Sequence, residues 1–133
     1  MRVETTSGKV YKIQFVHSSH DFNTTAPMAP GGLRQFVDNL ARSVRRRVTF
    51  CDISSVEAFA GDGMGNPDNI IYTSLAQGFT LCYYKDQFEK KTGRVFALDR
   101  ALLNSELSHD EEDEIWEACG FSFYDRPSQH GGH

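Results

Sequence analysis

Two polar segments of the chain carry residue types that bind metal ions or small molecules. The first, His17–Asp21, offers His17, His20 and Asp21 as ligands. A protein zinc site needs three or four converging ligands, and this segment supplies only part of such a set. The second, Gly61–Asp68, reads Gly-Asp-Gly-Met-Gly-Asn-Pro-Asp and lacks the spacing of dinucleotide, phosphate or calcium loops. We therefore predict no metal and no cofactor, and a metal-dependent or small-molecule-binding protein that uses both segments remains an alternative.

Signatures of nucleophilic catalysis are also missing from the sequence. No serine lies in a Gly-x-Ser-x-Gly context, and the surroundings of Cys51, Cys82 and Cys119 do not suggest an activated thiol. The carboxylates cluster on one predicted helix and offer no distinguished acid–base pair. We predict no catalytic residues, and a protein that is not an enzyme.

Positive charge is concentrated at two places in the sequence. One directly precedes the strand predicted over residues 48–54, and the other begins at the end of the strand predicted over residues 79–84. We predict helix and strands in the order α–β–β–β–α over residues 33–104, which is the order of a double-stranded-RNA-binding domain. Such modules grip phosphates with basic residues at the start of the last helix. A nucleic-acid-binding module is therefore one hypothesis, with the candidate residues Arg45, Arg46, Arg47, Lys85, Lys90, Lys91 and Arg94. The net charge of −4 argues against it.

Negative charge is concentrated between Glu106 and Glu117, where seven acids occur without Lys or Arg. Such segregation of charge is typical of a polar binding partner or of head-to-tail self-association in a homodimer, although solvated helix faces also explain it. The candidate binding face consists of Asp110, Glu111, Asp113, Glu114 and Glu117.

The elements that must position these residues follow from periodicity. Alternating apolar residues predict a hairpin over residues 2–16 with its turn at Ser7-Gly8, and an apolar stripe predicts a helix from Leu33 that the arginine triplet closes. Strands are expected over 48–54, 70–76 and 79–84, the last two joined by a turn at Gln77-Gly78, with irregular segments over 17–32 and 56–69.

Two helices are predicted after the strands. The first has Asp86 as its cap with Glu89 completing a capping box, and its apolar face consists of Phe88, Thr92, Val95, Leu98 and Leu102. Gly93 within it marks a kink, a close contact with the sheet or a break. The second begins at the cap Ser108, with Glu111 in the box, and ends at Gly120. Ile115, Trp116 and Cys119 form its apolar face.

Length and composition predict one α+β domain over residues 1–126 and a disordered tail over 127–133. A chain of 133 residues with 39% hydrophobic residues suffices for one core. The N-terminus lacks the apolar stretch of a signal peptide, and no run is long enough to span a membrane. The three widely spaced cysteines are expected as free thiols, so we predict a cytoplasmic protein.

The segment 82–102 carries a resemblance. It reads Cys-Tyr-Tyr-Lys-Asp-Gln-Phe-Glu-Lys-Lys-Thr-Gly-Arg-Val-Phe-Ala-Leu-Asp-Arg-Ala-Leu. This block, together with the segment 108–118, resembles a group of small, mostly uncharacterised proteins of bacteriophages and prophages, over about half of the chain. The resemblance implies a phage origin, a location in the host bacterial cell and a helix seated on a small sheet, with Asp86, Phe88, Gly93, Arg94 and Arg100 as its structural signature. It implies no activity.

We therefore expect a non-enzymatic phage accessory protein. It would bind and modulate or inhibit a host protein, such as a component of defence or transcription, through its charge-segregated surfaces. The acidic helix would compete for a basic groove on that protein.

Overall fold

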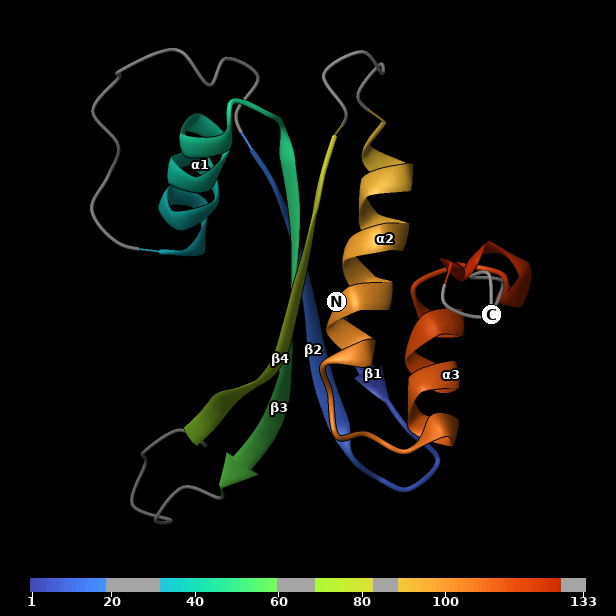
Figure 1. Cartoon of the computed structure of the whole chain (residues 1–133). Coiled ribbons are helices and arrows are strands. Elements are labelled where there is room, and N and C mark those ends of the chain that lie inside the picture. The colour runs from blue at the N-terminus through green and yellow to red at the C-terminus, as the bar shows by residue number, and fades with distance from the viewer. Residues whose placement is uncertain (19–31, 60–68, 83–88, 128–133) are drawn as a thin grey trace.

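The computed structural model describes residues 1–18, 32–59, 69–82 and 89–127. Within them, four antiparallel strands form one sheet in the order β1-β2-β3-β4, with helices on both of its faces (Figure 1). The predicted α+β class is confirmed. The elements are β1 (Arg2–Glu4), β2 (Val10–His17), α1 (Leu33–Val44), β3 (Val48–Phe59), β4 (Asn69–Leu81), α2 (Lys90–Leu103), α3 (His109–Ala118) and the 3-10 turn η1 (Phe123–Asp125).

The period-two pattern of the strands divides the core between the two faces of the sheet. Ile13 and Ile53 point to the face that α2 and α3 cover, where Leu98 completes the larger cluster. Val16 and Phe50 point to the opposite face, where α1 covers a smaller cluster. The sheet therefore lies between one helix and a pair of helices (Figure 1).

The predicted hairpin is confirmed, but the predicted three-stranded meander is wrong. β2 pairs with β3 from Tyr11↔Ser55 to His17↔Thr49, so the hairpin belongs to a four-stranded sheet. The central strands are also longer than predicted: β3 continues to Phe59 and β4 begins at Asn69. Pairing with β4 explains the extension of β3, because it outweighs the weak local preference of the polar residues there.

The predicted turn at Gln77-Gly78 does not exist, and β4 runs straight through both residues. A Cβ atom on Gly78 would lie 2.3 Å from the Ala101 backbone nitrogen and 2.6 Å from the Ala97 carbonyl oxygen. The glycine thus permits the backbone of α2 to pack directly on the sheet. The predicted strand over 79–84 ends at Leu81 instead.

Gly93, in α2, also permits close packing between the helix and the sheet, here against β3. Its Cβ position lies 2.2 Å from Thr49 Oγ1, and α2 continues through it without a break. Of the three interpretations of Gly93, the close contact with the sheet is therefore correct.

The apolar face of α2 is confirmed in part. Val95, Leu98 and Leu102 are buried, whereas Thr92 is exposed, contrary to prediction. The helix begins at Lys90 with Glu89 as its N-cap, so Glu89 is not part of a capping box. The predicted residues Asp86 and Phe88 lie outside the described residues.

Capping defines the other helices. The Ser108 hydroxyl accepts a hydrogen bond from the Glu111 amide at 3.3 Å, and Gly120 follows α3 with a positive φ of 83°, as predicted. α1 ends at Val44, earlier than predicted, because Arg45 adopts the left-handed conformation with φ 55°. The arginine triplet therefore lies between α1 and β3 and does not form the last turn of the helix.

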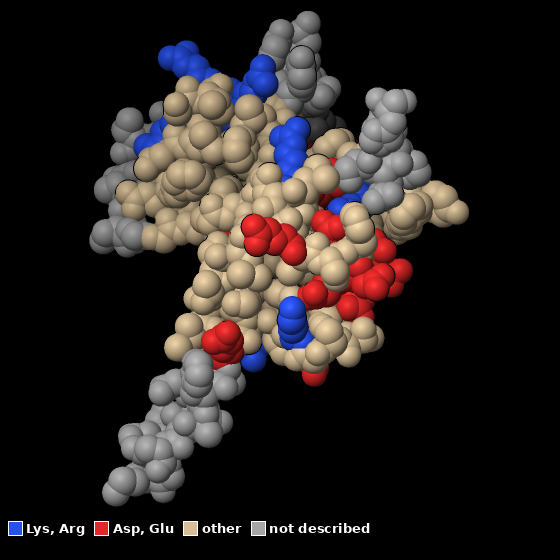
Figure 2. Space-filling view, turned by 60° about the horizontal axis from the view of Figure 1, so that its bottom comes forward, with Lys and Arg blue, Asp and Glu red and all other residues tan. Residues whose placement is uncertain are grey.

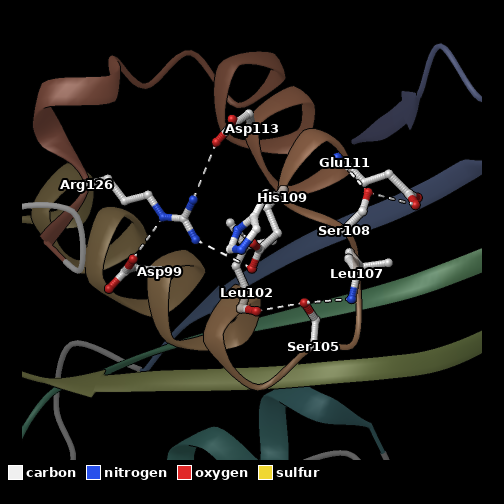
Figure 3. Close-up of polar contacts among 10 residues, drawn as sticks. Asp99, Leu102, Ser105, Leu107, Ser108, His109, Glu111, Asp113 and Arg126 are labelled. Atoms are coloured by element: carbon white, nitrogen blue, oxygen red, sulfur yellow. Dashed lines mark hydrogen bonds and ion pairs between the residues drawn. The ribbon is translucent and has the colours of Figure 1, made fainter.

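The chain end is fixed to both C-terminal helices by Arg126 (Figure 3). Its guanidinium lies 3.2 Å from Asp99 Oδ1 on α2 and 3.6 Å from carboxylate oxygens of Glu112 and Asp113 on α3. Arg126, Asp99 and Glu112 are all buried. Because a buried charge is stable only when paired, this cluster fixes α3 against α2.

No helix in the described ranges combines the length and apolar character that a membrane span requires. The three cysteines are free thiols, and Cys51 is buried in β3. Cys82 lies just after β4, whereas it was predicted to lie within a strand. The single domain over 1–126 and the disordered tail over 127–133 stay predictions, and residues 128–133 lie outside the described part of the chain.

Candidate functional site

A cavity of about 740 Å³ opens beside the C-terminal half of β2. It exists because β1 is short: β1 pairs with β2 only from Val10 to Lys12, so the edge of β2 beyond Ile13 has no partner strand among the described residues. We call this cavity the basic pocket. Its described lining residues are Gln14, Phe15, Val16, His17, Ser18, Arg34, Arg47 and Lys90.

Three cationic side chains reach the basic pocket from three separate parts of the chain. Arg34 comes from the first turn of α1, Arg47 immediately precedes β3, and Lys90 opens α2. The end of β2, the start of β3 and the start of α2 all lie at the same end of the sheet (Figure 1). The antiparallel topology thus collects charges that are up to 56 positions apart in the sequence.

The positive charges around the basic pocket affect the pKa of His17. Its Nδ1 atom lies 2.8 Å from the hydroxyl of Thr49, the residue opposite it on β3. Burial, and after it the charges of Lys90, Arg94, Arg47 and Arg34, together lower the pKa of His17 to about 4. The imidazole is therefore neutral at pH 7, because burial and these four cations disfavour a fifth positive charge.

The N-terminus of α2 adds to the positive potential. Its first turn carries no acidic residue, and the N-cap Glu89 makes no side-chain hydrogen bond to the helix amides. Instead, the Glu89 carboxylate accepts a hydrogen bond from the Thr92 hydroxyl at 2.9 Å. The partial positive charge at the N-terminus of α2 therefore lies in the same region as the Lys90 side chain.

This arrangement is suited to binding an anion with several oxygen atoms. Arginine presents several N–H donors in a planar fork that matches phosphate, and lysine contributes a compact positive charge. The neutral His17 forms a hydrogen bond with the Thr49 hydroxyl through Nδ1, which fixes the orientation of the ring. The basic pocket thus supplies donors and charge, while no described residue in it is placed as an activated nucleophile.

The structure brings together only part of the predicted basic set. Arg47 and Lys90 line the pocket, and the charge of Arg94 acts on His17. Arg45, Arg46 and Lys91 do not line it, and Lys85 lies outside the described residues.

Arg34 and His17 are the pocket residues that sequence reasoning missed. Arg34 is held by an ion pair with the buried Asp38, 3.7 Å away and four positions along α1. That i,i+4 pattern is visible in the sequence, but it indicates only a helix surface pair.

His17 was considered as a metal ligand, yet it lies among cations. The described residues contain no group of three His, Cys, Asp or Glu side chains that could hold a metal ion. The other candidate ligands, His20, Asp21 and the Gly61–Asp68 segment, lie outside the described residues. The metal-dependent or small-molecule alternative stays a prediction for those segments.

The acidic face of α3 is divided between structural and exposed side chains. Glu111 accepts a hydrogen bond from the Tyr11 hydroxyl, whose pKa this contact and burial raise, and Glu114 accepts one from the Thr6 amide at 3.0 Å. Asp113 pairs with Arg126. The two remaining members, Asp110 and Glu117, are exposed.

Charge is segregated on the surface of the molecule (Figure 2). Red side chains gather in a patch on the right of this view, whereas most of the blue side chains lie toward the top. On the face in view, acidic and basic side chains of the described residues therefore gather mostly in different regions.

Comparison of the chain with protein-family models, with curated proteins and with solved structures finds no match. The resemblance of residues 82–102 to small phage proteins, and the phage origin and cytoplasmic location that it implies, therefore stay predictions.

Proposed function

We propose that this protein is a non-enzymatic binding protein that holds the phosphate backbone of a nucleic acid in its basic pocket. The observation that carries the proposal is the convergence of Arg34, Arg47 and Lys90 on one cavity around a neutral His17. Nucleic acids present their phosphates in series, and cations held in fixed positions release counterions when they bind them.

The edge of β2 supports the proposal further, because no strand in the described part of the chain pairs with it beyond Ile13. Backbone N–H groups on such a strand edge add donors that bind oxygen atoms without regard to base sequence. Phe15, which is half-buried, gives the cavity one aromatic wall on which a base can stack. Binding of this kind reads the backbone, so we expect little sequence preference.

The experiment is fluorescence anisotropy with labelled single-stranded and duplex oligonucleotides over a series of salt concentrations. The variant Lys90→Gln removes one pocket charge, and Lys9→Gln removes one charge from a side chain that pairs with Glu111 at 3.8 Å, away from the pocket. Because Lys90→Gln loses one phosphate contact, it should lower the slope of log Kd against log salt concentration by about one. Lys9→Gln should leave this slope unchanged. The proposal fails if neither kind of oligonucleotide binds at low salt, or if both variants weaken binding equally.

The acidic face supports a second proposal, that α3 binds a basic surface of a host protein. The exposed patch of Figure 2 is the observation in its favour. Because Glu111, Asp113 and Glu114 also hold the fold together, the test should use Asp110→Asn combined with Glu117→Gln, both on exposed residues. Tagged protein should capture a bacterial partner at low salt and lose it at high salt or in this variant. Capture that is indifferent to salt contradicts the proposal.

A further inference from the structure

The two edges of the sheet are protected very differently. The β1 edge is three residues long and carries Arg2 and Glu4, the kind of charged residues that prevent strands from pairing edge to edge. The β4 edge is 13 residues long and contains no Asp, Glu, Lys, Arg, His or Pro. A long, uncharged edge strand is the feature that natural sheets normally avoid.

Part of the β4 edge is nevertheless covered. The Asn104 side chain donates a hydrogen bond to the Gln77 carbonyl at 3.0 Å, and Arg100 donates one to the Phe79 carbonyl at 2.7 Å. The register shifts where Ile53 pairs with Ala76 and Ser54 with Ser74, which leaves a bulge on β4. These contacts and the bulge protect the C-terminal half of the strand. In the described ranges, neither a side-chain bond to the strand's carbonyl groups nor a bulge falls within the segment Ile70–Ser74.

The unprotected segment also projects from the body of the sheet. The register between β2 and β3 stops at Ser55, so the last residues of β3 pair only with β4, and Figure 1 shows this ribbon extending past the helices. Ile70, Ile71 and Tyr72 are 45%, 48% and 46% exposed on it. A two-stranded ribbon is marginally stable alone and gains stability from a third strand.

We propose that this edge is a dimerisation surface, on which the segment Ile70–Ser74 pairs antiparallel with the same segment of a second copy of the chain. The segment is compatible with pairing to a second copy of itself. It contains no charged residue, so its own side chains bring no like charges together across a two-fold axis, and its apolar side chains would cover one another. The length of the open segment, about five residues, matches a common strand length.

The test is the molar mass of the full chain measured by light scattering over a range of concentrations up to millimolar. We expect the mass to rise from one copy to two. The variant Ile71→Lys removes an apolar side chain and places the two lysines diagonally across the two-fold axis at Tyr72, about 7–8 Å apart on one face of the paired strands, and should weaken the dimer by at least about tenfold. The control Val44→Lys makes the same change at an exposed position on α1, where Val44 is 38% exposed, and should dimerise like the wild type.

A measurement on the wild type alone keeps the proposal testable if Ile71→Lys fails to fold. Amide hydrogen exchange of Ile70–Ser74 should slow as the protein concentration rises, because pairing protects strand amides. A chain that stays monomeric at millimolar concentration overturns the inference, as does a dimer that Ile71→Lys leaves intact. Nucleic-acid binding by the basic pocket is independent of either result.

Discussion

Acidification should destabilise this protein through one histidine, His17. Its pKa in the folded protein is about 4, against an ordinary value of 6.5, because burial and neighbouring cations oppose protonation. Between these two values the unfolded chain binds the proton and the folded protein does not, so lowering the pH through this window favours unfolding. Above about pH 6.5 neither state is protonated, and below about pH 4 both are, so the loss is confined to the interval between them.

The magnitude follows from the shift. The full difference corresponds to about 3 kcal/mol, and because the imidazole is partly exposed, solvent screening reduces the expected effect to about 1–2 kcal/mol. The assay is urea denaturation of the wild type and of His17→Gln, which retains a polar group beside Thr49 but cannot titrate. The stability of the wild type relative to the variant should fall by about 1–2 kcal/mol between about pH 7 and about pH 4.

The comparison of two proteins isolates the histidine, because the carboxylates that titrate in the same range contribute equally to both. A difference in stability that does not change with pH would refute the reasoning. So would an NMR titration in which the resonance assigned to His17, by its absence in His17→Gln, moved with a pKa near 6.5. If the basic pocket binds phosphate, saturating inorganic phosphate should raise the pKa of His17, since the bound negative charge offsets the cations.

Three further predictions concern packing, the buried charge cluster and thiol reactivity. Gly78→Ala should lower the free energy of unfolding by about 2–3 kcal/mol in urea, because its new methyl group meets the Ala101 backbone and α2 must move away from the sheet. Arg126→Met should lower the same quantity by about 3–5 kcal/mol, because the buried carboxylates of Asp99 and Glu112 lose the buried guanidinium that pairs with both. Cys51 should be alkylated far more slowly than Cys82, as measured by peptide mass mapping, because burial raises the thiol pKa of Cys51 and blocks access.

Matched variants separate these effects from general damage. Gly8→Ala also alters a glycine, but in open space at a turn with φ 87°, and should cost only about 1–2 kcal/mol of backbone strain. Lys9→Met removes an exposed partner of Glu111 and should cost less than about 1 kcal/mol. The packing argument is wrong if Gly78→Ala is no worse than Gly8→Ala. The charge argument is wrong if Arg126→Met matches Lys9→Met, and equal alkylation rates would contradict the burial of Cys51.

Local signals in the sequence predicted the parts of the fold that depend on local physics. Ser108 begins α3 because the capping interaction with the Glu111 amide lies within four residues, and this half of the predicted capping box is confirmed. The Glu111 carboxylate accepts a hydrogen bond from the Ser108 hydroxyl at 3.3 Å, which is not the second bond of the predicted box. Gly78 shows where such reasoning ends. Its φ lies outside the left-handed region, and what requires glycine there is the α2 backbone at Ala97 and Ala101, about twenty positions later in the chain. A glycine that makes room for another element carries the same local signature as one that makes a turn.

The basic pocket was predictable only in part for a related reason. Clusters of charge at Arg45–Arg47 and Lys90–Arg94 were visible in the sequence, yet proximity along the chain did not select the residues that meet. Arg47 faces the cavity and Arg45 does not, because Arg45 adopts the left-handed conformation that ends α1. Arg34 joined the pocket through the packing of α1 on the sheet, a tertiary contact without a sequence signal.

A net charge of −4 argues against nucleic-acid binding only if the charge is evenly spread. α2 has 14 residues, so its two ends are about 20 Å apart, with Lys90 at one end and the first, acidic turn of α3 beside the other (Figure 1). The Debye length at physiological salt is about 8 Å, so that acidic turn scarcely weakens the field at the basic pocket. Lower salt lengthens the screening distance and lets the acids repel a nucleic acid. Neutralising Asp110 should therefore strengthen oligonucleotide binding at low salt and leave it unchanged at physiological salt; strengthening at both would show that the two surfaces are not electrostatically separate.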